Sequence, residues 1–153
     1  TRELVWDRPM VLSGRTLLLC AVSVGNPHCV AHFSSETDLD KLPWQGWGHT
    51  LEMHPLFPNR TNCQFMRLVD RGHLEIRIWE RGAGPTLASG SSAVAAFSVA
   101  RRKGWVDASA TVHMPGGDLI VGEKQDGFLI QKGPVEEIGE MSVRADIFAR
   151  PRR

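Results

Sequence analysis

The stretch Ala88-Ser89-Gly90-Ser91-Ser92-Ala93-Val94-Ala95-Ala96-Phe97-Ser98-Val99-Ala100 decides the fold of this chain. From Ala93 to Ala100 it has almost no polar face, and a helix that is apolar on all sides belongs in the interior of a domain. The basic residues 101–103 suit the negative end of the helix dipole, and Gly104 suits the position just after a helix. The sequence therefore predicts a central, buried α-helix.

A strand and a glycine-rich loop lead into this helix. Residues 74–80 alternate apolar and charged side chains, which is the pattern of a half-buried strand, and Gly82 and Gly84 follow. The loop opens a helix whose first N–H groups have no partner within the helix, and such helix starts bind anions. We therefore expect the substrate to bind at this loop.

Short apolar runs separated by turn residues predict further strands around the helix. We predict an α+β domain in which an antiparallel β-sheet wraps around the central buried α-helix. An extended linker or edge segment is expected at 1–14, the domain at 15–141 and a basic tail at 142–153. The strands are expected at 15–24, 29–33, 63–69, 74–80, 111–114, 119–122 and 127–131, with a short helix at 47–54.

Composition excludes several classes of protein. The 153 residues fit one domain, and a formal net charge of +1 provides no strong field for binding nucleic acid or membranes. No stretch approaches the length of a membrane span, and no signal peptide is visible. Three cysteines without a Cys-x-x-Cys pair are typical of reduced thiols in the cytoplasm. The chain begins at Thr1 in place of Met, which leaves open that it is a fragment.

Four polar clusters lie at predicted strand ends or in loops, at 25–28, 60–62, 80–82 and 88–91. Taken singly, each has a structural explanation, because Asn and Ser are common in turns and at helix caps. A Glu beside an Arg is equally well explained as a solvated ion pair. No single cluster therefore indicates a function.

Taken together, the clusters resemble the C-terminal half of diaminopimelate epimerase. The resemblance runs from Leu17 to Ile138 and keeps several motifs in one order, with Pro115-Gly116-Gly117 and Gly133-Pro134 at its end. The stretches that carry it are Val22-Ser23-Val24-Gly25-Asn26-Pro27-His28, Glu52-Met53-His54-Pro55, Phe57-Pro58-Asn59-Arg60-Thr61-Asn62 and Trp79-Glu80-Arg81-Gly82-Ala83-Gly84.

The resemblance implies a cofactor-independent amino-acid epimerase or racemase, which for diaminopimelate serves the biosynthesis of lysine and peptidoglycan precursors. Members of the family invert an α-carbon without pyridoxal phosphate. They use two acid/base residues on opposite faces of the substrate, one from each of two similar halves. Each half is a sheet wrapped on a central helix, and the substrate cleft lies between the halves.

The resemblance also implies roles for five residues of this chain. Asn26, Asn62 and Arg81 would bind the distal end of diaminopimelate. Glu80 and His28 would lie by the reacting carbon, with Glu80 receiving the α-ammonium group. A planar guanidinium suits a bidentate contact with a carboxylate, which agrees with the role implied for the arginine.

The start of the central helix carries both an agreement with the family and a departure from it. The backbone N–H groups of Gly90 and Ser91 would take the α-carboxylate, which agrees with the argument from the helix start. The family's acid/base in this half is a cysteine in an Ala-Cys-Gly pattern. This chain has Ala88-Ser89-Gly90, so that Ser89 stands at the catalytic position.

Serine makes the chemistry harder. A thiol has a pKa near ~8.5 that a helix start lowers further, whereas a hydroxyl needs a neighbouring base such as His28 or Glu80. Three explanations are open: a cysteine replaced by serine for an experiment, a natural serine-bearing relative, or an amino-acid-binding relative that has lost catalysis. We favour the natural relative.

The second departure is that the family's first half is absent from this chain. Half a cleft cannot perform a two-base epimerisation, so we expect this half alone to be inactive. We expect a missing N-terminal half-domain or a second copy of the chain, as a homodimer, to supply the other face around the amino-acid substrate.

Two further classes of site are disfavoured. A serine hydrolase would need a Gly-x-Ser-x-Gly turn, which the residues around Ser89 lack. A zinc site would need closely paired ligands. We therefore predict no metal, because that spacing is lacking among His28, Cys29, His49, His54, Cys63 and His113.

Overall fold

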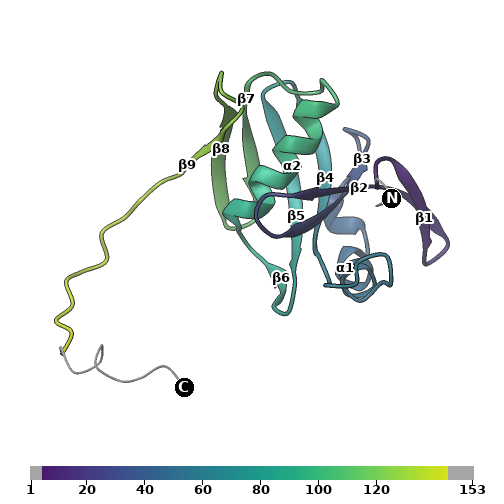
Figure 1. The fold of residues 1–153 in the computed structure, drawn as a ribbon, viewed down its shortest axis with the longest axis horizontal. Coiled ribbons are helices and arrows are strands. Elements are labelled where there is room, and N and C mark those ends of the chain that lie inside the picture. The colour runs from purple at the N-terminus through teal and green to yellow at the C-terminus, as the bar shows by residue number, and fades with distance from the viewer. Residues whose placement is uncertain (1–4, 145–153) are drawn as a thin grey trace.

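A computed structural model describes residues 5–144 as a curved nine-stranded sheet wrapped around helix α2 (Gly90–Arg102), as Figure 1 shows. This arrangement confirms the predicted α+β fold with a central helix. The other helical elements are α1 (Trp44–Glu52) and the short turn η1 (Leu39–Lys41). The strands are β1 (Arg8–Leu12), β2 (Arg15–Ser23), β3 (Pro27–Phe33), β4 (Asn62–Asp70), β5 (His73–Glu80), β6 (Gly84–Thr86), β7 (Ser109–Met114), β8 (Gly117–Glu123) and β9 (Leu129–Lys132).

The sheet is mixed, although the sequence predicts an antiparallel one. Its order is β1-β2-β3-β4-β5-β7-β8-β9, with β6 paired to β5. Neighbours are antiparallel except for β3 with β4 and β5 with β7. Parallel strands need a crossover, and α1 supplies one between β3 and β4 while α2 supplies the other.

Helix α2 forms the first core of the domain. Its small side chains let the sheet approach closely, and strands β2 to β5 and β7 to β9 contact it. Ala93, Ala96 and Phe97 are fully buried against Val30 and Ile78 of the sheet. The helix is not apolar on all sides, because Ser98 is half-buried and Arg102 is exposed.

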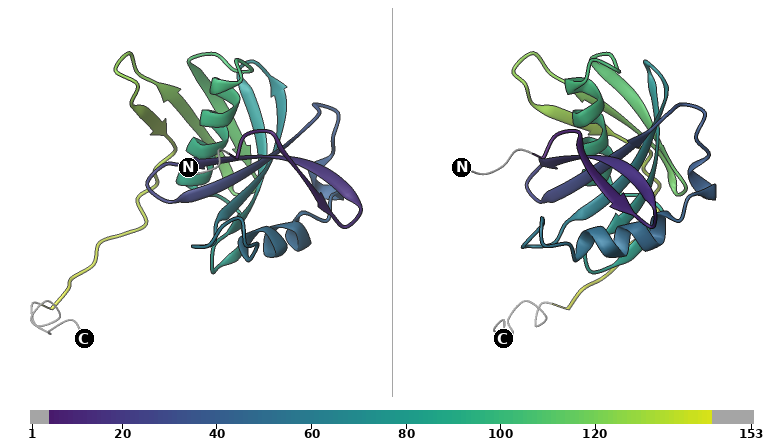
Figure 2. Two further views of the ribbon diagram at one scale, coloured as in Figure 1. Left: turned by 45° about the vertical axis from the view of Figure 1, so that its right-hand side comes forward. Right: turned by 90° about the vertical axis from the view of Figure 1, so that its right-hand side faces the viewer.

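A second core lies on the opposite face of the sheet, beneath α1. Successive residues of a strand point to opposite faces, so that Val30 faces α2 while Cys29 belongs to the second core. Trp47 and Leu51 of α1 complete this core. Figure 2 shows α1 on the side of the sheet away from α2, so that the strands lie between the two cores.

The described part of the chain begins close to an edge strand and ends in an extended segment. The N-terminal edge is the strand β1, and residues 133–144 have no regular structure and run away from the body of the domain (Figure 1). Most of the predicted basic tail, residues 145–153, lies outside the described residues, as do residues 1–4. Among residues 5–144, no helix is both long and apolar enough to cross a membrane.

Candidate active site

The parallel strands β3 and β4 begin at the same end of the sheet. The predicted polar residues lie at this end. His28 pairs in register with Asn62. The Asn62 side chain donates from Nδ2 to the Pro27 carbonyl at 2.9 Å and accepts from the Arg81 N–H at Oδ1, also at 2.9 Å. Asn62 therefore holds three segments together, a structural task that the sequence did not reveal.

His28 is buried beneath this edge. The residue is 1% exposed, and Nε2 of its ring lies 3.0 Å from Oδ1 of Asn26. Burial lowers the pKa of His28, and Gln64 and Glu80 only partly oppose this effect. Burial therefore favours the neutral form of His28 near pH 7.

A hydrogen bond holds the first turn of α2 next to the same strands. Nε2 of Gln64 donates to Oγ of Ser92 at 3.0 Å, and Gln64 lies two residues along β4 from the strand end. Ser89 is the N-cap of the helix, in extended conformation, and its side chain makes no capping hydrogen bond. The Ser89 side chain therefore leaves the N–H groups of Gly90 and Ser91 uncapped.

A pocket of about 250 Å³ opens at the start of α2. The turn between β7 and β8 forms its opposite wall, and this turn is held to the loop by a hydrogen bond from the Gly116 N–H to the Leu87 carbonyl at 2.8 Å. The residues that line it are Ala88, Ser89, Gly90, Met114, Gly116, Gly117, Asp118, Leu119 and Pro134. The pocket thus contains two of the predicted site residues, while the strand-end residues lie outside its wall.

The remaining predicted residues lie around the strand ends. Glu80 is the last residue of β5 and is half-buried, as is Asn26. Arg81 is exposed, and its Nη1 donates to the Asn59 carbonyl at 3.0 Å. Among residues 5–144, no side chain hydrogen-bonds the Ser89 hydroxyl, so neither His28 nor Glu80 is placed as its base here.

Glu52 organises the loop next to the site, and the sequence reasoning missed it. Its side chain is 7% exposed, and its carboxylate accepts from Nε1 of Trp79 at 2.7 Å, from the Gly82 N–H at 2.9 Å and from Nη1 of Arg60 at 3.5 Å. Burial raises the pKa of Glu52, but these donors outweigh it and lower the pKa below its ordinary value. Glu52 therefore stays ionised and holds the loop 80–84 in place.

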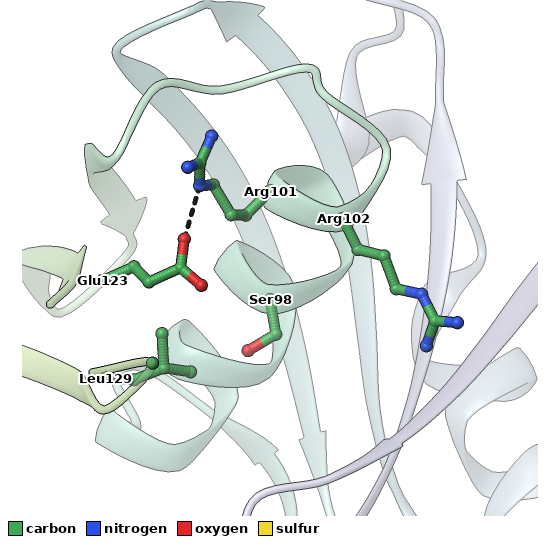
Figure 3. A pocket seen from close by; sticks show the side chains of 6 residues that line it. Ser98, Arg101, Arg102, Glu123 and Leu129 are labelled. Atoms are coloured by element: carbon green, nitrogen blue, oxygen red, sulfur yellow. Dashed lines mark hydrogen bonds and ion pairs between the residues drawn. The ribbon is translucent and has the colours of Figure 1, made fainter. Parts of the chain in front are cut away.

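A larger pocket, of about 540 Å³, lies elsewhere, at the other end of α2. Figure 3 shows Arg101 and Glu123 facing each other across it, with Nε 2.8 Å from Oε2, and Arg102 pointing away. Ser98 and Leu129 complete the labelled wall. None of the predicted site residues lines this pocket.

Within residues 5–144, one group of side chains has the composition of a metal site: Asp7, Cys20 and His32. The residues weighed for zinc from the sequence are not in it. Nζ of Lys103 lies 2.5 and 2.6 Å from the two carboxylate oxygens of Asp7, so that a fixed positive charge already occupies this place. The cluster joins the N-terminal segment to the end of α2.

Comparison with known proteins gives the family. A model of the diaminopimelate epimerase family matches residues 20–138. The chain belongs to the diaminopimelate epimerase family. It is 40% identical over 148 residues to diaminopimelate epimerase 2 of Nostoc sp., which covers 97% of this chain and 50% of that protein. It is 38% identical to the diaminopimelate epimerase of Pelotomaculum thermopropionicum, over 88% of this chain and 47% of that one.

This epimerase-family chain thus spans about half the length of the curated relatives it matches. A solved structure also resembles its fold: a phenazine biosynthesis protein of the PhzF family from Enterococcus faecalis, with a TM-score of 0.51 and 18% identity. The match covers 66% of this chain and 35% of the solved one. It supports the fold alone.

Proposed function

We propose that the chain supplies one face of a cofactor-independent amino-acid epimerase or racemase that acts on diaminopimelate or a related amino acid. The observation that carries this proposal is the start of α2, where the uncapped N–H groups of Gly90 and Ser91 are fastened beside the polar strand ends by the Gln64–Ser92 hydrogen bond. A carboxylate is stabilised at such a helix start, because both the N–H groups and the helix dipole favour an anion.

The proposed roles of the strand-end residues follow from the family. Asn26, Asn62 and Arg81 bind the distal amino-acid end, and Glu80 receives the α-ammonium group. The exposed guanidinium of Arg81 supports its role, because it is accessible to a ligand carboxylate. His28 stays neutral in its buried position and serves the reacting centre.

Ser89 takes the position of the acid/base. Removing an α-proton without an electron sink requires a water-poor pocket with fixed dipoles, and the helix start provides the dipoles. Because the hydroxyl is a weak acid, we propose that a base approaches it only when substrate and the second half close the site.

The other face comes from a second body of similar fold, either an N-terminal half-domain or a second copy of this chain. The coverage of about half of each relative supports this proposal. The apolar side chains of Val135, Ile138 and Met141 are 96%, 101% and 87% exposed in the segment that leaves the domain, which favours contact with another body. We assign the protein to the cytoplasm because its three cysteines are free.

A second candidate is an amino-acid-binding relative without catalysis. The absence of a hydrogen-bonded base at the Ser89 hydroxyl, among the residues that the structure describes, favours it. In this case the helix start binds the carboxylate, and the α-proton is never exchanged.

Amide NMR on the ¹⁵N-labelled chain tests the shared binding site. Titration with diaminopimelate should shift the Gly90 and Ser91 signals, while the Gly72 amide, already bonded to Asp70 at 2.7 Å, serves as the unmoved control. Shifts confined to Arg101 and Glu123 would place the ligand in the other pocket and contradict the proposal.

A further inference from the structure

Three neighbouring polar side chains are buried below the proposed site. His28 is 1% exposed, and Gln64 and Ser92 are both 0% exposed. Burying a polar group without a partner is costly, so each atom is expected to be paired. The Nε2 of Gln64 is paired with Ser92, while Nδ1 of His28 and Oε1 of Gln64 are buried and have no partner with good hydrogen-bond geometry.

These two atoms complement each other. His28 pairs in register with Asn62, and Gln64 is two residues farther along β4, so that both side chains lie on the same face as diagonal neighbours. One N–H of the Gln64 amide is donated to Ser92, and Oε1 is the Gln64 atom that is buried without a partner, so that it is the acceptor open to the imidazole. An acceptor beside Nδ1 favours the imidazole tautomer that carries its hydrogen there.

We propose that Gln64, oriented by Ser92, is a positioning residue that fixes His28 in the tautomer with hydrogen on Nδ1 and a free lone pair on Nε2. The Nδ1–H donates to Oε1 of Gln64, and Nε2 faces Asn26, whose Oδ1 lies 3.0 Å away. Rotation of the Asn26 carboxamide by half a turn places its Nδ2–H against the lone pair on Nε2 of His28. His28 then faces the strand-end site as a base, not as a donor.

This inference rests on the proposed function for the use of the base, but its geometry does not. The Gln64–Ser92 hydrogen bond also connects the two parts of the site. Ser92 lies in the first turn of α2, next to the N–H groups proposed to bind the carboxylate. Binding of a ligand at the helix start and orientation of His28 therefore involve the same series of side chains, Ser92, Gln64 and His28.

The test is long-range ¹H–¹⁵N NMR of the histidine rings in the ¹⁵N-labelled chain at neutral pH. The wild type should show His28 with hydrogen on Nδ1. Gln64→Met, which keeps the length of the side chain but removes the acceptor, should move His28 to the tautomer with hydrogen on Nε2, donating to Asn26. The same change at the exposed Gln45 is the matched control and should leave His28 unaltered.

A second variant addresses charge. In Gln64→Glu a carboxylate faces the imidazole, so that the pKa of His28 should rise by about one unit or more. Ser92→Ala should produce a mixture of tautomers, because Gln64 is then free to turn.

A wild-type His28 with hydrogen on Nε2 would overturn the inference without any variant having to fold. So would an unchanged tautomer in folded Gln64→Met. Because the measurement needs no activity, either result would leave the proposed epimerase function standing. Conversely, a confirmed tautomer in a protein without α-proton exchange would refute only that function.

Discussion

At the scale of single residues, Glu52 is the buried charge on which the loop beside the site depends. A hydrogen bond to a charged acceptor contributes about 1.5–3 kcal/mol, and this carboxylate accepts from both Trp79 and the Gly82 N–H. Glu52→Gln should therefore lower the free energy of unfolding by about 2 kcal/mol in urea titration. Glu36→Gln, at an exposed position, is the control and should have almost no effect. Equal stabilities of the two variants would contradict this role.

Glu52 also predicts a pH dependence. Its pKa is lowered in the folded state, so its contribution to stability is present above the ordinary value of 4.5 and is lost as the pH falls through the lower, folded value. The stability difference between wild type and Glu52→Gln should shrink as the pH falls below 4.5. A difference that stays constant down to pH about 2 would show that ionisation is not involved.

The sequence predicted where along the strands most candidate residues lie, but not which groups they bond. His28, Asn62 and Glu80 lie at strand ends as predicted, because strand ends follow from local alternation and turns. The hydrogen bonds of Asn62 to Pro27 and Arg81 depend on which strands are neighbours, and the local sequence pattern does not predict strand pairing. Gln64 was missed, although the period of two along β4 places it on the same face as Asn62.

At the scale of elements, α1 offers a matched pair of glycines. A Cβ on Gly48 would lie 2.5 Å from Cβ of Trp79, whereas a Cβ on Gly46 would meet nothing within 4 Å. Gly46→Ala should stabilise the protein by up to about 1 kcal/mol through helix propensity. Gly48→Ala carries the same propensity gain but should destabilise, by about 1–3 kcal/mol, because Trp79 must move. Thermal unfolding of both variants measures the contrast, and a stabilised Gly48→Ala would contradict the packing of α1.

The N-terminal segment is tied to the end of α2 by charge. The pKa of Asp7 is lowered to about 2 by Lys103 and His32, so this stabilisation is complete above the ordinary value of 3.8 and is lost as the pH falls from there toward 2. Because the carboxylate is 42% exposed, screening leaves on the order of 1 kcal/mol. Lys103→Met should lower the stability at pH 7 by this amount but not at pH about 2, in urea titrations at both pH values. An equal loss at both would contradict the ion pair.

The elements themselves were largely predictable, and their pairing was not. The sequence predicted strands at 15–24 and 63–69, which overlap β2 and β4 closely. The helix expected at 47–54 is found at Trp44–Glu52, starting directly after Pro43, because proline is well tolerated at a helix start. The two parallel pairs arise from crossovers through α1 and α2, and a local pattern carries no information on the direction of pairing.

At the scale of the whole molecule, the chain belongs to the diaminopimelate epimerase family and spans about half the length of the relatives it matches. The start of α2 and the strand ends are brought together by the wrapping of the sheet, which no separate motif would predict. The central helix predicted from 88–100 is the exception, because its composition already required that other elements surround it.

The most direct test of the central claim is α-proton exchange into diaminopimelate in D₂O, followed by NMR, with the complete native protein. We predict that the wild type exchanges the proton, that Ser89→Ala slows the exchange by about 10²-fold or more, and that Ser89→Cys retains it. Exchange by Ser89→Cys alone would favour the binding relative. Undiminished exchange by Ser89→Ala, or none by wild type and Ser89→Cys alike, would contradict the account that this chain carries the acid/base face.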